Sequence, residues 1–326
     1  MRPLTLRRNY KWLAATIVVV CFLVSIMGNS RIIPYVSSFS WSLGDAWPTF
    51  DEEVVVINED PDTLFQLDLL HEIEIEMDED DFDTMVLTFE ETDEKEFFHA
   101  SVTIDGEYYE DVGIRLKGNS TLNSSLGMGM SPMGKESETV IDFDIPYLIK
   151  LNEFVTGQDY QGYQQIALRS QFNDNAMMRE VLGYRILDIL GITAPQSAYS
   201  IITFNGEQSL YAITEVIVEE FVDKYLVEEG EEIGNLFKAS PGAKLEYTSD
   251  DPLDYQDFEQ KTNTNKEDLY QIIEFAEFVS NSTDEEFEAG LDEYIDIEST
   301  LQYLAFCNII VNMDSFAGNG NNYYLY

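Results

Sequence analysis

The sequence predicts an α+β protein in which a strand-rich part is followed by a mostly helical part. Two dipeptides, Asp105-Gly106 and Asn205-Gly206, favour the tight turns of β-hairpins, and strand-like segments flank both of them. After Val218 the pattern becomes acidic and helical instead. This order of elements predicts two structural parts within one domain, residues 67–326.

The strand-rich part is expected to contain six strands. Residues 71–77 alternate apolar and acidic side chains at the period of a half-buried strand. The other predicted strands are residues 97–104 and 108–117, 147–154, and 200–204 and 210–216. Asp78 to Asp81 precede a short predicted helix at 82–87, and acids there suit a helix N-terminus better than a calcium loop, because the glycine and spacing of an EF-hand are missing.

Three longer helices are predicted farther along the chain. The first, residues 176–190, has Asn173 and Asp174 as candidate N-terminal caps and Gly191 after its end. The second covers residues 267–280, and the third starts near Asp296 and leads to Asp314. A polar insertion at about 240–264 separates the acidic helical segment after Val218 from the predicted helix at 267–280.

The first 31 residues are predicted to be an uncleaved signal anchor. Basic residues precede an apolar run from Trp12 to Gly28, and no clean A-x-A-like cleavage site follows. The basic flank places the N-terminus in the cytoplasm and the domain outside the membrane. A secreted protein with a cleaved signal peptide is the alternative. Residues 32–66 are interpreted as an acidic linker.

The chain is strongly acidic, with 62 Asp and Glu, 18 Lys and Arg, and a net charge of −44. Such a charge excludes nucleic acid as a partner, and we interpret it as adaptation to salty surroundings. A hydrophobic content of 44% is enough for a packed core, so global disorder is excluded. The two cysteines, Cys21 and Cys307, are predicted to be buried free thiols.

Basic residues are unevenly placed, which raises the possibility of a phosphate site. Between positions 115 and 185 lie Arg115, Lys117, Lys135, Lys150, Arg169, Arg179 and Arg185. A chain of this charge repels phosphate at long range, so binding requires concentrated cations, and arginine suits phosphate through its planar fork. Simple balancing of nearby surface acids explains the clustering equally well.

A loop next to two of these cations favours the phosphate interpretation. Arg115 and Lys117 precede Gly118, Asn119 and Ser120, whose small side chains allow backbone N–H groups to approach phosphate oxygens. The loop matches neither the Walker A motif nor G-x-G-x-x-G. A plain glycine turn is the alternative.

The predicted helix at 176–190 carries an acid among small residues. Ala176 and Gly183 share a face with Glu180, which suggests close approach of another backbone. An inward carboxylate needs a cation, and Lys150 on the preceding strand is the best candidate by order and type. A strand lysine held by a helix glutamate is how kinases present an ammonium group to phosphates. An exposed Glu180 without a partner is the alternative.

The end of the chain carries a second kinase-type feature. An apolar run at 301–311 leads to Asp314, and Asn319 follows five residues later. The spacing D-x-x-x-x-N is how protein kinases place a catalytic base and a magnesium ligand on one loop. The spacing alone is a weak signal.

These features together resemble the CotH kinase family, named for a bacterial spore-coat protein. The resemblance runs in family order through residues 112–121 (VGIRLKGNST), 150–154 (KLNEF), 178–182 (MREVL), 210–215 (LYAITE), 234–238 (GNLFK) and 312–326 (NMDSFAGNGNNYYLY). It implies a two-lobed, atypical protein-kinase-like fold. It also implies binding of ATP with Mg or Mn, and phosphorylation of Ser or Thr on secreted or surface proteins.

The resemblance also implies roles for individual residues. Asp314 resembles the catalytic aspartate, and Asn319, or Asn322 as a close competitor, a metal ligand. The other residues implied in nucleotide binding are Lys150 with its partner Glu180, Glu215 in the segment that meets the adenine, and Arg115, Lys117, Gly118, Asn119 and Lys238 near the phosphates.

The chain departs from the family pattern at two places. Asn321 stands where the family usually has His. A following W-D-x-D-like segment with a metal-binding aspartate is missing, so we expect a C-terminally incomplete domain with little catalytic activity.

Two other functions are considered beside the kinase. One is a non-catalytic surface adhesion or assembly module, and the other is a transferase that moves a different part of the nucleotide. A basic, Ser/Thr-rich acceptor is expected from charge complementarity.

Overall fold

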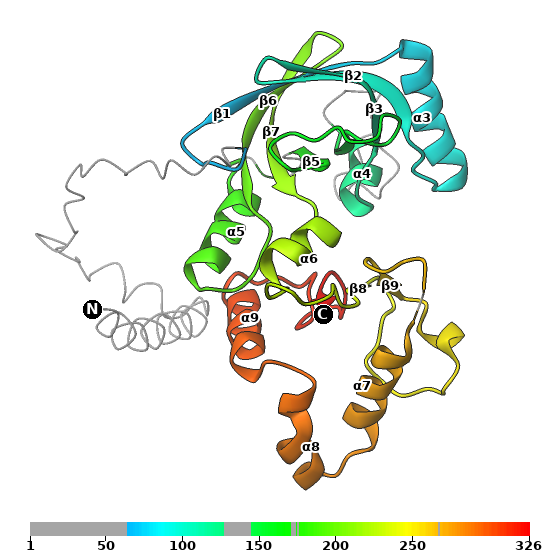
Figure 1. Cartoon of the computed structure of the whole chain (residues 1–326), viewed down its shortest axis with the longest axis vertical. Helices are drawn as coiled ribbons and strands as arrows, with labels where there is room; N and C mark the ends of the chain where they lie inside the picture. Colours follow the sequence, from blue (N-terminus) through cyan, green and yellow to red (C-terminus); the bar gives the residue numbers. More distant parts are fainter. Residues whose placement is uncertain (1–63, 127–144, 171–173, 175, 267) are drawn as a thin grey trace, which may run out of the picture.

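The computed structural model describes residues 64–126, 145–170, 174, 176–266 and 268–326 (Figure 1). The predicted signal anchor at 1–31 and almost all of the predicted linker lie outside these residues, as do Cys21 and Asn173. Within the described ranges, no helix is both long and apolar enough to cross a membrane.

The first part of the structure is a closed seven-stranded barrel with the order β1-β2-β3-β4-β5-β7-β6. All neighbours are antiparallel except β1 and β6, whose parallel pairing closes the barrel. The strands are β1 (Leu70–Glu76), β2 (Phe98–Ile104), β3 (Glu107–Leu116), β4 (Tyr147–Lys150), β5 (Gln165–Ser170), β6 (Ser197–Phe204) and β7 (Glu207–Glu215). Closure satisfies the backbone hydrogen bonds that an open sheet would leave at its edges.

Both predicted hairpins are confirmed. Asp105 and Gly106 connect β2 to β3 with φ angles of 50° and 87°, and Asn205 and Gly206 connect β6 to β7 with φ angles of 47° and 92°. Two consecutive positive φ angles match the turn that suits the twist of paired strands. The predicted alternation of β1 is also confirmed, because every second residue is buried.

The first helix, α3 (Glu79–Thr92), is longer than predicted. Asp78 caps it by accepting a hydrogen bond from the backbone N of Asp80 at 2.9 Å, which confirms the acids as a helix start. Phe82, Met85, Val86 and Phe89 form its buried face at helical spacing. The six-residue α4 (Ser120–Ser125) follows β3.

The helix with the predicted inward glutamate is α5 (Arg179–Ile189). The helix begins at Arg179 instead of the predicted 176, and Met178 is its N-cap residue. Asp174 still holds the chain before the helix, because it accepts backbone hydrogen bonds from Ala176, Met178 and Arg179 at 2.7–3.2 Å. The close backbone approach predicted beside Glu180 is wrong. A Cβ atom added to Gly183 would meet nothing within 4 Å, so this glycine faces open space.

The second part combines helices with a small sheet of order β10-β8-β9. Its elements are α6 (Glu219–Tyr225), β8 (Phe237–Ala239), η1 (Pro252–Tyr255), β9 (Phe258–Gln260), α7 (Tyr270–Asn281), α8 (Asp284–Gly290), η2 (Leu291–Glu293), α9 (Ile297–Ile309) and β10 (Tyr324–Leu325). In Figure 1 the second part lies on the same side of the barrel as helix α5. The predicted helix start at Asp296 is confirmed as a cap, and Cys307 is a buried free thiol as predicted.

The two parts have separate hydrophobic clusters. The larger one fills the barrel and includes Ile73, Ile114, Ile149 and Leu168. The smaller one joins β8 and β9 to α7 through Phe237, among others. The predicted α+β class is therefore confirmed. Two details of the prediction are wrong, because the strand at 147–154 ends at Lys150 and because β5 was not predicted.

Replacement of Gly113 by Ala should destabilise the barrel by roughly 1–3 kcal/mol, because overpacking forces neighbouring atoms to move. A Cβ atom at Gly113 would come within 2.7 Å of Glu153 Cβ and 2.9 Å of a Phe97 ring carbon. Gly183→Ala is the matched control. It lies inside α5 with free space around it, so it should stabilise the protein by roughly 0.5–1 kcal/mol through helix propensity. Urea unfolding measures both. Equal effects of the two substitutions would contradict the packing described here.

Candidate phosphate-binding site

The outer face of the barrel gathers three of the predicted cations. On β3, Ile114 and Leu116 belong to the core, so Arg115 lies on the opposite face. Lys117, which directly follows β3 and whose backbone N donates to the Pro146 carbonyl at 2.9 Å, continues this alternation. On β5, Ile166 and Leu168 belong to the core, so Arg169 lies on the same outer face. Strand β4 pairs with both β3 and β5, which makes this face continuous.

The small C-terminal sheet contributes two more cations to the same place. Lys238 lies on β8, and Lys261 directly follows β9. Lys117 interacts electrostatically with Arg169, Arg115, Lys238 and Lys261. We call these five residues the cation cluster. Lys261 was not singled out from the sequence, because it lies within the polar insertion, far from the other cations along the chain.

Three members of the cluster have lowered pKa values. Burial, and then the four neighbouring cations, lower the pKa of Lys117 to about 7. Burial and Lys261 lower the pKa of Lys238. Burial also lowers the pKa of Arg115. Arg169 differs: burial acts to lower its pKa, but the charge and hydrogen bonds of Glu180, together with Tyr184, leave the pKa raised.

The partner of Glu180 is Arg169, and the predicted pairing with Lys150 is wrong. Arg169 Nε donates to both carboxylate oxygens of Glu180 at 2.9 and 3.2 Å, and Thr214 Oγ1 donates to Oε1 at 3.1 Å. Lys150 lies opposite Gln165 on β5, four residues from Arg169 and so about 13 Å along the strand. It pairs instead with Glu153 at 2.6 Å.

Two ammonium groups of the cation cluster lack a partner. Within the described residues, neither Lys117 nor Lys238 forms a hydrogen bond or an ion pair through its side chain. In contrast, Lys261 is paired with Glu259. Arg115 donates to the Leu116 carbonyl at 3.2 Å and lies over the Phe97 ring at 5.1 Å. Cations that are partly buried without a counterion favour the binding of an anion.

The predicted loop at Gly118 and Asn119 is a turn between β3 and α4. Gly118 has a φ angle of +94°, which L side chains rarely adopt, so glycine is required there. The side-chain oxygen of Asn119 accepts a hydrogen bond from Lys95 Nζ at 3.0 Å. A phosphate contact by either residue stays a prediction.

Asp314 is held by two asparagine side chains. Asn321 Nδ2 donates to Oδ1 at 3.0 Å, and Asn322 Nδ2 donates to Oδ2 at 2.6 Å. Asn319, predicted from spacing, instead uses its backbone N to bond the Met313 carbonyl, and its side chain is exposed. The structure therefore brings Asn322, rather than Asn319, to Asp314. Asn321 was not predicted to take part in the site.

The donor atoms around Asp314 suit a magnesium-type cation of modest affinity. The part of the chain that the structure describes contains no group of three or more His, Cys, Asp or Glu residues placed to hold a metal. Asp314 contributes one carboxylate, and Asn322 could offer its amide oxygen in the opposite orientation of that amide. Mg²⁺ is commonly bound by one or two carboxylates together with substrate phosphates. These residues therefore fit such a metal.

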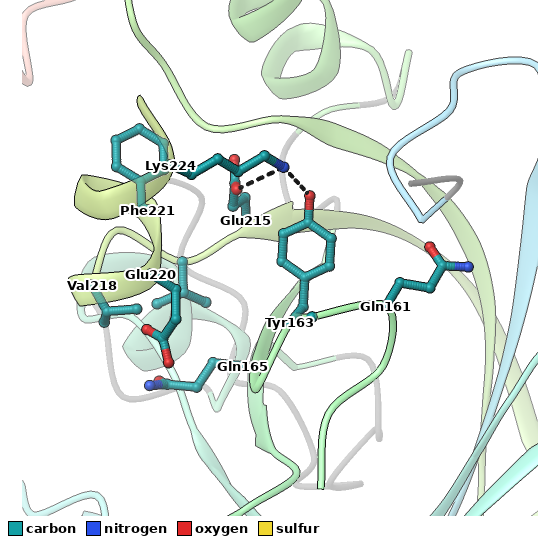
Figure 2. A pocket seen from close by; sticks show the side chains of 10 residues that line it. Gln161, Tyr163, Gln165, Glu215, Val218, Glu220, Phe221 and Lys224 are labelled. Carbon is teal, nitrogen blue, oxygen red and sulfur yellow. Dashed lines mark hydrogen bonds and ion pairs between the residues drawn. The ribbon is translucent and has the colours of Figure 1, made fainter. Parts of the chain in front are cut away.

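Glu215 is buried and turned toward helix α6. Its Oε1 lies 4.0 Å from Lys224 Nζ, and its Oε2 accepts a hydrogen bond from the backbone N of Gln196 at 3.1 Å. Figure 2 shows Lys224 between Glu215 and Tyr163, whose hydroxyl is 2.7 Å from Nζ. The cavity beside these residues has a volume of about 250 Å³, below the ~300 Å³ at which small-molecule sites begin. The Glu215 side chain thus joins β7 to α6, and its predicted place near an adenine stays a prediction.

A double-mutant cycle should detect coupling between Arg169 and Glu180. Both side chains are partly exposed, so we expect Glu180→Gln to cost about 1–2 kcal/mol, between the values for surface and buried pairs. The cost should largely disappear in an Arg169→Met background, because the partner is gone. Lys150→Met is the control background, in which the full cost of Glu180→Gln should remain. Guanidinium unfolding measures all of these, and coupling to Lys150 instead would contradict the pairing.

Comparison with the models of known protein families gives one match. The profile of the family described as CotH kinase protein matches residues 114–326, well over half of the chain. The match covers β4, β5 and the C-terminal part and includes all five cations of the cluster, together with Asp314. No curated protein matches the chain. The protein belongs to the CotH kinase family.

Proposed function

We propose that the protein is an ATP-dependent kinase that phosphorylates Ser or Thr residues of secreted or cell-surface proteins. The carrying observation is the cation cluster, which contains two unpaired ammonium groups in a chain with a net charge of −44. Family membership suggests a kinase-like enzyme. The acceptor class, the use of ATP and the use of Mg or Mn are part of the proposal.

The cluster is suited to a chain of phosphates rather than to a single anion. Its cations come from the barrel on one side and from the C-terminal sheet on the other. Arg169 is held by Glu180 in one orientation, and its planar guanidinium group is of the kind that suits phosphate recognition. We assign phosphate contacts to Arg115, Lys117, Arg169, Lys238 and Lys261. Lys150 becomes a weaker candidate because Glu153 already pairs with it.

Asp314 is proposed as the residue that orients the acceptor hydroxyl and takes its proton. The hydroxyl oxygen would form the new bond to the terminal phosphorus while the bond from phosphorus to the bridging oxygen breaks and ADP leaves. The amide groups of Asn321 and Asn322 hold one carboxylate oxygen each, which limits rotation of the carboxylate. A divalent cation bound near Asp314 and Asn322 would neutralise charge on the phosphates.

The location and partners also remain proposals. We propose that the N-terminal segment anchors the protein in a membrane with the kinase domain outside the cytoplasm. The acidic surface would favour a basic, Ser/Thr-rich acceptor over a nucleic acid. A two-lobed kinase-like arrangement, with the barrel as one lobe, is consistent with the two hydrophobic clusters.

Asp314→Asn should lower phosphate transfer by roughly 10²–10⁴-fold, because the amide cannot accept the hydroxyl proton. Binding of ATP in the absence of a divalent metal should change little, since Asp314 is not part of the cation cluster. Transfer from labelled ATP and equilibrium binding measure the two effects separately. Asn319→Ala is the matched control from the same loop and should retain activity, because its side chain is exposed and away from Asp314.

Two outcomes would contradict the kinase proposal. Unchanged transfer in Asp314→Asn would remove Asp314 from the chemistry. Tight binding of ATP without transfer by the full-length ectodomain would favour the non-catalytic module. Transfer of the nucleotide moiety, seen as a mass increase larger than one phosphate on the acceptor, would favour the alternative transferase.

A further inference from the structure

We propose that binding of a polyphosphate at the cation cluster is coupled to uptake of a proton by Lys117, so that affinity falls as pH rises above neutrality. The inference rests on the proposed function for the identity of the anion. It adds a regulatory property to that site, since the occupancy of the site would depend on external pH.

The geometry places Lys117 among other cations. Arg115 lies two residues away on the same face of β3, and Arg169 is on the same outer face of the barrel, two strands farther along. Lys238 and Lys261 approach from the C-terminal sheet. The other titratable or charged groups that face the cluster are Lys95, Glu153, Glu180, Tyr184, Glu259 and Tyr324.

The nearby carboxylates are already committed to other cations. Glu180 pairs with Arg169, Glu259 with Lys261, and Glu153 with Lys150. In the described part of the chain, no carboxylate lies within ion-pair distance of Lys117. Its ammonium form is therefore opposed by burial and by four like charges, and its pKa is lowered to about 7.

A bound polyphosphate would reverse this balance. It brings several negative charges next to Lys117, and nearby opposite charge favours the protonated amine. The pKa of Lys117 would then rise from about 7 toward its ordinary value. At pH 8 most molecules without ligand carry a neutral amine, so binding takes up close to one proton. At pH 6 the amine is already charged, and uptake is close to zero.

The sign of the pH dependence follows from this linkage. Proton uptake on binding means that affinity decreases as pH rises above the pKa of the free protein. With one proton involved, the decrease approaches roughly tenfold per pH unit above 7. Below pH 7 the contribution of Lys117 to affinity should be constant.

Isothermal titration calorimetry with inorganic tripolyphosphate tests the inference without adenine or metal. Titrations at pH 8 in two buffers with different ionisation enthalpies yield the number of protons exchanged. Lys117→Arg keeps a cation that does not titrate in this range, so it should bind with similar affinity and take up about one proton less than the unaltered protein. This difference also removes any protons exchanged by tripolyphosphate itself. Lys244→Arg, an exposed lysine outside the cluster, is the matched control and should exchange protons as the unaltered protein does.

Lys117→Met provides a second test, which does not require that the larger arginine side chain be accommodated at position 117. Its affinity for tripolyphosphate should be lowest relative to the unaltered protein at pH 6.5, where Lys117 is charged. The ratio of the two affinities should shrink by roughly tenfold or more at pH 8.5. A ratio that stays constant with pH would overturn the inference.

The results separate the inference from the proposed function. Equal proton exchange by the unaltered protein and Lys117→Arg, or no binding of tripolyphosphate, overturns the inference. If the unaltered protein still transfers phosphate at pH 6.5, the proposed function stands without the proton-linkage inference. If proton-linked binding is found while transfer is absent with every acceptor and metal tried, the inference stands and the kinase proposal fails.

Discussion

Mutual repulsion among five cations is the constraint to which the rest of the site must conform. The chain has few basic residues, and the structure places five of them together instead of dispersing them among 62 acids. Such an arrangement costs free energy in the absence of a ligand, since the charged forms of Lys117 and Lys238 are disfavoured both by burial and by neighbouring cations. Costs of this kind are common at functional sites, where stability is given up for binding or catalysis.

The barrel supplies the rigidity that holds these charges in place. Arg115 and Lys117 are fixed by the alternation of β3, and Arg169 by the alternation of β5, because a slip of one residue would turn each of them into the core. Glu180 pairs with Arg169 from helix α5, whereas Lys117 and Lys238 have no such partner among the described residues. The helix thus fixes the orientation of Arg169 within the cluster.

Local patterns predicted the elements better than they predicted contacts. The two glycine turns, the alternation of β1 and the caps at Asp78 and Asp296 are short-range features, and all of them are found in the structure. The pairing of Glu180 was assigned to Lys150 because β5 was not recognised, and without β5 Arg169 had no place on the barrel face. Lys261 and Asn321 were missed because their positions depend on the C-terminal sheet and on a loop conformation, which no periodic pattern encodes.

The central claim is that the cation cluster holds phosphates, and a crystal structure with magnesium and a non-hydrolysable ATP analogue tests it most directly. The account predicts phosphate oxygens within hydrogen-bonding distance of Lys117, Lys238 and the Arg169 guanidinium, with Asp314 near the terminal phosphate. A nucleotide bound elsewhere, for example in the cavity beside Lys224, with the cation cluster left without an anion, would contradict it.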